Sequence, residues 1–115
     1  MYVLPAIVFS VLFCYVLSDT PEEIMVNRYC ENDCNREKTR ICVQKHIPIY
    51  LSTYENCVKT VQDGLTTAKE WDQFVCHDAT NQESLLIINC LFGTMREKYG
   101  NVDDVAKECL EQSGC

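Results

Sequence analysis

The sequence predicts an all-α protein, a compact bundle of about five capped helices stapled by four disulfides. In several places a Ser or Thr is followed three residues later by Glu, a pairing that satisfies two free backbone amides at a helix start. The stretch 80–100 repeats apolar residues at helical spacing, and no alternating strand pattern occurs along the chain. Cysteine is also unusually frequent for a chain of 115 residues, which indicates a scaffold of disulfides.

Residues 1–18 are expected to be a secretory signal peptide. Met1–Leu17 carries no charged side chain, and small Ser18 is followed at once by acidic Asp19. An apolar run of this length with such an end is typical of a signal cut before Asp19. The alternative is a retained membrane anchor, but no basic cluster follows the run to stop its transfer. After cleavage we expect no membrane insertion and one disulfide-rich helical domain, residues 19–115.

Each expected helix has its own start signal. Thr20 to Glu23 opens the first helix, with Pro21 at a position where its missing N–H costs nothing. The same Ser/Thr-to-Glu pairing opens the next three helices, at Ser52–Glu55, Thr67–Glu70 and Thr80–Glu83. Asn101 opens the fifth helix, where two following aspartates suit the helix dipole.

The expected helix ends are marked by proline and glycine. Pro48 stops the first helix after His46, because the residue before a proline avoids the helical region. Gly64 is expected to end the second helix and Gly100 the fourth, each as a left-handed cap.

The fourth helix, within 80–100, is predicted to be the core element. Its first half is apolar on nearly every face, which indicates a helix buried all round. The apolar run is too short and too closely flanked by charge to span a membrane. Burial would contribute about 10–15 kcal/mol before chain entropy is subtracted, from Leu85, Leu86, Ile87, Ile88, Leu91 and Phe92.

The cysteines predict the covalent framework. Of the nine in the chain, Cys14 falls in the signal and eight follow it: Cys30, Cys34, Cys42, Cys57, Cys76, Cys90, Cys109 and Cys115. Eight cysteines behind a signal indicate four disulfides, whose pairing the sequence leaves open. Cys30 and Cys34 share a helix face and are expected to bridge to different partners, and Cys90 to a neighbouring helix. No closely spaced cysteine pair suits zinc, so no metal and no cofactor is expected.

No group of residues indicates an enzyme. The segment Cys76-His77-Asp78 invites comparison with secreted phospholipases A2, but their doubled cysteine and glycine-rich calcium loop are missing. With all eight cysteines expected in disulfides, no thiol is left as a nucleophile, and no serine stands beside a base. We therefore expect a non-enzymatic protein.

The charge distribution suggests one candidate surface. The formal net charge of −7 argues against binding nucleic acid through bulk charge. Within this acidic chain, four basic side chains form a strip that could seat on an acidic receptor or channel surface: Arg36, Lys38, Arg40 and Lys45. The alternative is a solvated helix face paired with neighbouring acids. Trp71 is the best single binding anchor if it is exposed.

By type, the chain resembles the small helical, disulfide-rich secreted proteins of invertebrate venoms and haemolymph. The resemblance rests on the signal, the eight cysteines and the capped helices, while the cysteine spacing differs from that of insect odorant-binding proteins and saposins. It implies a secreted, extracellular protein that binds a target, with a venom toxin acting on an ion channel or receptor as the first hypothesis. The alternatives are a carrier of a small hydrophobic ligand and a host-defence protein, which the negative charge disfavours.

Overall fold

Helices and short turns make up residues 21–31 and 33–112, the part of the chain that this computed structural model describes, and no strand occurs there. The predicted all-α class is thereby confirmed. The helices are, in chain order, α2 (Pro21–Cys30), α3 (Asp33–His46), α4 (Tyr50–Lys59), α5 (Ala68–Gln73), the π-helix η1 (Phe74–Asp78), α6 (Asn81–Lys98) and α7 (Val102–Gln112). The predicted signal peptide lies outside these residues. None of the described helices is long and apolar enough to cross a membrane.

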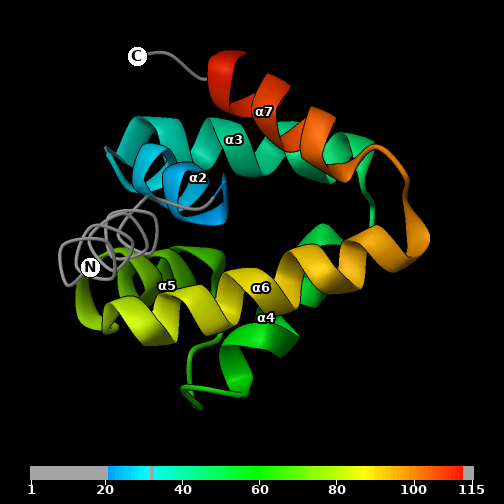
Figure 1. The fold of residues 1–115 in the computed structure, drawn as a ribbon. Coiled ribbons are helices and arrows are strands. Elements are labelled where there is room, and N and C mark those ends of the chain that lie inside the picture. Colours follow the sequence, from blue (N-terminus) through cyan, green and yellow to red (C-terminus); the bar gives the residue numbers. More distant parts are fainter. Residues whose placement is uncertain (1–20, 32, 113–115) are drawn as a thin grey trace, which may run out of the picture.

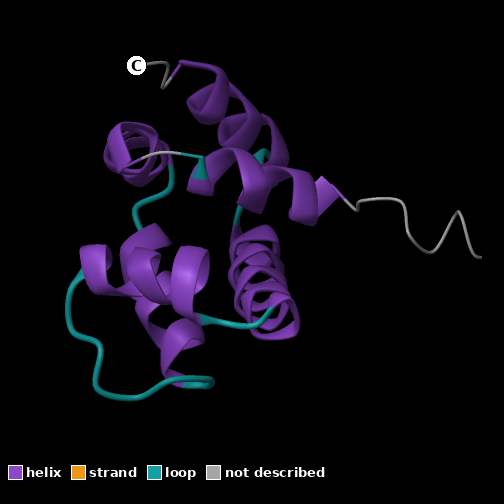
Figure 2. Ribbon diagram, turned by 90° about the vertical axis from the view of Figure 1, so that its left-hand side faces the viewer, coloured by secondary structure: helices purple, strands orange, loops and turns teal. Residues whose placement is uncertain are grey.

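The helices form two layers. One layer holds α2, α3 and α7, and the other holds α4, α5 and α6, as Figure 1 shows. The view turned by 90° in Figure 2 keeps the same separation and shows one long loop in the lower layer besides the short ones. Apolar side chains from both layers meet between them in one buried cluster that includes Val43, Tyr54, Ile87 and Val102. The core is therefore shared by segments far apart in the sequence.

Of the disulfides between described residues, one lies within each layer and a third joins the two layers. Cys42 of α3 bonds to Cys109 of α7, and Cys57 of α4 bonds to Cys90 of α6. Cys30 at the end of α2 bonds to Cys76 of η1 and so links one layer to the other. The expectation that Cys90 ties α6 to a neighbouring helix is confirmed.

Cys30 and Cys34 bond to different partners, as predicted, because Cys30 is bonded to Cys76. Cys34 is itself disulfide-bonded. Cys115 lies outside the described residues.

The predicted first helix is two helices, which is why the described part holds six α-helices rather than five. The chain breaks after Cys30 and resumes at Asp33. Asn32 and Asp33 are residue types that compete with helix interiors by bonding to nearby backbone, and they favour turns and helix starts. The expected end at His46, before Pro48, is confirmed.

Two of the capping predictions are confirmed and one is wrong. At Thr67 and at Thr80 the hydroxyl accepts from the backbone N–H three residues on, and Glu70 or Glu83 accepts from the capping residue's N–H. Ser52 caps nothing, because α4 already begins at Tyr50 and the Ser52 hydroxyl donates back to the carbonyl of Ile49. Thr20 lies outside the described residues, while α7 starts directly after Asn101 as predicted.

Neither glycine ends its helix in the predicted way. The helix α4 ends at Lys59, and Gly64 lies in the following loop, where its φ of 89° serves a turn rather than a cap. Gly100 follows α6, but Gly64 is the only described glycine with positive φ, so Gly100 is not a left-handed cap. Thr60 and Tyr99 occupy the C-cap positions instead, and the backbone N–H of each donates into the preceding turn.

The helix α6 is central but not buried on every face. Ile87, Ile88, Leu91 and Phe92 are buried as predicted, and Met95 is buried with them. Leu86 is 56% exposed, however, and Leu85 is only partly buried. A helix covered by one opposing layer leaves its far side to solvent, so burial all round was a wrong prediction.

Candidate functional site: a cavity between the two layers

The layers do not fill the space between them completely. A cavity of about 50 Å³ remains there, with an apolar lining from five helices and the α3–α4 turn. Its lining residues are Met25, Val26, Tyr29, Thr39, Val43, Ile47, Tyr50, Tyr54, Ile88, Leu91, Phe92, Met95, Val102, Ala106 and Leu110. None of these described lining residues is charged, so the cavity suits an apolar occupant.

One side of the cavity lies near the surface. Met25 and Val26 of α2 and Leu110 of α7 line it and are only partly buried, whereas the other lining residues are buried. The cavity therefore approaches solvent between α2 and α7, and α2 covers it on that side.

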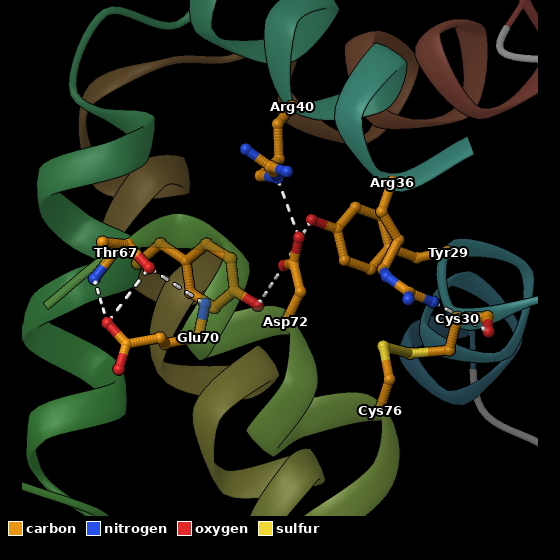
Figure 3. Close-up of polar contacts among 9 residues, drawn as sticks. Tyr29, Cys30, Arg36, Arg40, Thr67, Glu70, Asp72 and Cys76 are labelled. Atoms are coloured by element: carbon orange, nitrogen blue, oxygen red, sulfur yellow. Dashed lines mark hydrogen bonds and ion pairs between the residues drawn. A yellow bond between two sulfur atoms is a disulfide. The ribbon is translucent and has the colours of Figure 1, made fainter. Parts of the chain in front are cut away.

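At its other end the cavity borders a buried polar cluster centred on Asp72. Tyr29 and Tyr54 both donate to Asp72 Oδ1, at 2.6 and 2.8 Å, and Arg40 Nε donates to Oδ2 at 2.8 Å. Figure 3 shows Tyr29 and Arg40 reaching Asp72 from the opposite layer. Asp72 is 2% exposed, and its charge is balanced by Arg40, which is what allows a carboxylate to be buried here.

The electrostatics of this cluster keep the three tyrosines neutral. Burial raises the pKa of Tyr29 far above its usual value, and neighbouring tyrosines and Asp72 add to the shift. Burial also raises the pKa of Tyr50 and of Tyr54, with the charge of Asp72 as the second cause in both. For Arg40, burial is the largest effect and lowers the pKa, but attraction and hydrogen bonding to Asp72 and Tyr29 together outweigh it, so the pKa is raised.

Local sequence explains how Asp72 reaches this position. The Thr67–Glu70 capping box starts α5, which Figure 3 shows beside the cluster. The next turn then places Trp71 and Asp72 side by side on the buried face, where Trp71 packs edge-on against Tyr54 with ring centroids 5.4 Å apart. The Trp71 indole N–H donates to the carbonyl of Leu65. A short capped helix thus orients the only buried carboxylate among the described residues.

The predicted basic strip is not one surface. Arg36 is 7% exposed and donates to the carbonyl of Cys30, and Arg40 faces inward to Asp72. Only Lys38 and Lys45 are exposed. The strip was a wrong prediction because a helix of 14 residues turns its side chains through every direction, and two of the four face the core.

Trp71 is not a surface anchor. It is 5% exposed, with its ring against Tyr54 and its one donor satisfied by Leu65. A binding anchor must reach its partner, so the predicted role of Trp71 does not fit the structure.

Asp72 was not predicted from the sequence, because it carries no local motif. Tyr29, Tyr50 and Tyr54 are aromatic residues that the sequence allows either to line a pocket for a hydrophobic ligand or to pack in the core, and the structure places all three in the cavity lining. The only sequence signal for Asp72 is the helix start at Thr67. A helix that begins there places Asp72 next to Trp71, and the two side chains are buried together. Among the described residues, no group of three or more His, Cys, Asp or Glu side chains is placed to hold a metal ion.

Comparison with known proteins does not assign the chain to a family. No protein-family model, characterised protein or solved structure matches the chain. The fold and the site therefore define the class by themselves, as a disulfide-linked, two-layered α-helical protein with an apolar cavity at its centre.

Proposed function

We propose that this is a secreted, non-enzymatic protein that carries a small, uncharged apolar molecule between its two helical layers. The observation that carries the proposal is the cavity itself, which lies between the two layers and opens toward the surface beside α2 and α7, where a solid bundle would have packed side chains. Well-packed cores leave few voids of this size, and a retained one loses packing energy unless it is used. Secretion is supported by the disulfides, which are typical of oxidising compartments.

The lining indicates the class of ligand. The hydroxyls of Tyr29 and Tyr54 already donate to Asp72, so the cavity offers mostly aromatic and aliphatic surface. A carboxylate or ammonium buried there would lose its hydration without a partner, which is costly. The cavity is several times larger than the 10–15 Å³ or so that one water needs, and a ligand as large as benzene or octanol enters it only when the two layers move apart.

The proposal is tested by titrating the disulfide-intact protein with benzene, octanol and octanoate while recording NMR spectra. Benzene and octanol are expected to shift the methyl signals of Val43, Leu91 and Val102. Octanoate is expected to bind at least about tenfold more weakly, because a buried unpaired charge costs more than 1.4 kcal/mol. Failure of every uncharged ligand to shift these signals would overturn the proposal.

A matched pair of variants tests whether binding occurs in this cavity. Ala106→Leu places extra methyl groups into the cavity, whereas Ala68→Leu makes the same change in α5 away from the lining. Loss of benzene binding in the first variant only, with both folded by circular dichroism, is the expected result. Equal binding in both would place the ligand elsewhere.

A second candidate function is binding to an extracellular receptor or ion channel, as a venom toxin does. The observation that favours it is Ile41, which is 64% exposed on α3 between Lys38 and Lys45 on one helix face. On any responsive channel, the double reversal K38E/K45E is expected to abolish the effect and K69E, in the other layer, to preserve it. An unchanged response in K38E/K45E excludes this face.

A further inference from the structure

We propose that α2 is a lid over the cavity, hinged at its Cys30 end and latched at its Glu22 end by Arg96. This inference rests on the proposed function, because it assigns the way in which a ligand enters and leaves the same cavity. The two ends of α2 are held in different ways.

The C-terminal end of α2 is fixed. Cys30 is covalently bonded to Cys76 in the opposite layer, and its carbonyl accepts from Arg36 at 3.2 Å. The neighbouring Tyr29 donates to buried Asp72. Figure 3 shows these contacts gathered at one place, beside the end of α2. This end cannot leave the core without breaking a covalent bond or a buried polar cluster.

The N-terminal end is held by charge at the surface. Arg96 of α6 bonds to Glu22 of α2 at 3.2 Å and to Asp103 of α7 at 2.5 Å. The side chains of Arg96, Asp103 and Glu22 are 41%, 58% and 20% exposed, so the pair with Asp103 is weak and salt can screen both pairs through Arg96. Arg96 also lies 5.1 Å from the ring centre of Phe92, which lines the cavity. One residue thus joins the three helices that border the cavity at this end.

Because the Cys30 end of α2 is fixed and the Glu22 end is held by surface ion pairs, α2 can rotate about its Cys30 end. Met25 and Val26 lie between the two ends of α2 and form part of the cavity wall. A helix of ten residues is about 15 Å long, so a rotation of about 20° at Cys30 moves the Glu22 end by about 5 Å. That movement lifts both side chains from the cavity, while the disulfides within each layer keep the remaining helices paired. Opening breaks the latch and removes Met25 and Val26 from the cavity wall.

The latch variants are Arg96→Ala and Glu22→Gln, and the control is Lys59→Ala, which removes an exposed ion pair with Glu55 on α4. In the ligand-free protein, amide hydrogen exchange at residues 25–28 is expected to rise about three- to tenfold in R96A and about two- to fivefold in E22Q. K59A is expected to leave this exchange unchanged. Added salt is expected to raise it in the wild type and to have little effect in R96A.

Ligand kinetics separate a latch from a merely structural residue. A latch slows entry and release alike, so R96A is expected to raise both rate constants for octanol by similar factors and leave Kd nearly unchanged. If Arg96 were merely structural, R96A would raise Kd or raise amide hydrogen exchange throughout the chain. Either of those results, or unchanged exchange in α2, would overturn the inference. The exchange measurement needs no ligand, so it tests the latch even if the carrier proposal fails.

Discussion

Tyr29 and Asp72 lie 43 residues apart in the chain and meet through a buried hydrogen bond of 2.6 Å that joins the two helical layers. Around it, Tyr54 and Arg40 complete the bonding of the carboxylate. Among the described residues, no buried side-chain nitrogen or oxygen atom lacks a hydrogen-bond partner. A buried cluster of this kind stabilises one arrangement of the layers, because any other would leave a charge without a partner.

Replacement of Asp72 is expected to be among the most destabilising single changes. Asp72→Ala leaves the Arg40 charge and two tyrosine hydroxyls without their acceptor, which costs about 3–5 kcal/mol of the free energy of unfolding. Urea denaturation measures this loss. The control is Asp78→Asn, an exposed site expected to change stability by less than about 0.5 kcal/mol. A loss below about 1 kcal/mol in D72A would show that the cluster is not a structural anchor.

Stability is expected to fall at alkaline pH because the pKa values of Tyr29, Tyr50 and Tyr54 are raised on folding. Above pH of about 10 the unfolded chain releases these protons while the folded protein retains them. The free energy of unfolding then decreases as pH rises, by about 1.4 kcal/mol per pH unit for each tyrosine. Denaturation curves at a series of pH values measure the slope. Tyr54→Phe should reduce it, and an unchanged slope would contradict the assignment.

The two confirmed capping boxes are expected to contribute measurably to stability. Thr67→Ala and Thr80→Ala each remove an acceptor for a backbone N–H at a helix start, at a cost of about 0.5–2 kcal/mol. Ser52→Ala is the matched control, because this serine lies inside α4 and caps nothing. Thermal or chemical denaturation of the three variants checks the difference. Equal effects at all three sites would contradict the assigned helix starts.

The disulfide between the layers is expected to differ from those within them. Loss of Cys30–Cys76 in a double alanine variant should cost about 2–5 kcal/mol and also accelerate hydrogen exchange along α2. Loss of Cys57–Cys90, within one layer, should cost a similar amount with no selective effect on α2. Mass spectrometry with hydrogen exchange on both variants makes the comparison. The same exchange pattern in the two would show that Cys30 is not the hinge.

The sequence by itself determined the class of fold and several local features. The capping boxes at Thr67 and Thr80 were predictable because the Thr and Glu of each box lie within one helical turn, so their spacing alone predicts the contact. The burial of Ile88 and Phe92 in α6 was predictable for a similar reason, because apolar residues recur there at helical spacing, but the face that is left to solvent at Leu86 was not. The break of the first helix at Asn32–Asp33 was missed because a weak local preference competes there with tertiary contacts.

The tertiary structure alone decided the disulfide pairing, the burial of Arg36, Arg40 and Trp71, and the cavity. Eight cysteines allow about a hundred pairings, and only the packing of the helices selects among them. Asp72 meets Tyr29 across 43 residues with no spacing rule between them, so no sequence pattern could reveal the cluster. A cavity likewise has no sequence signature, because it is the volume that five helices fail to fill once their positions are set.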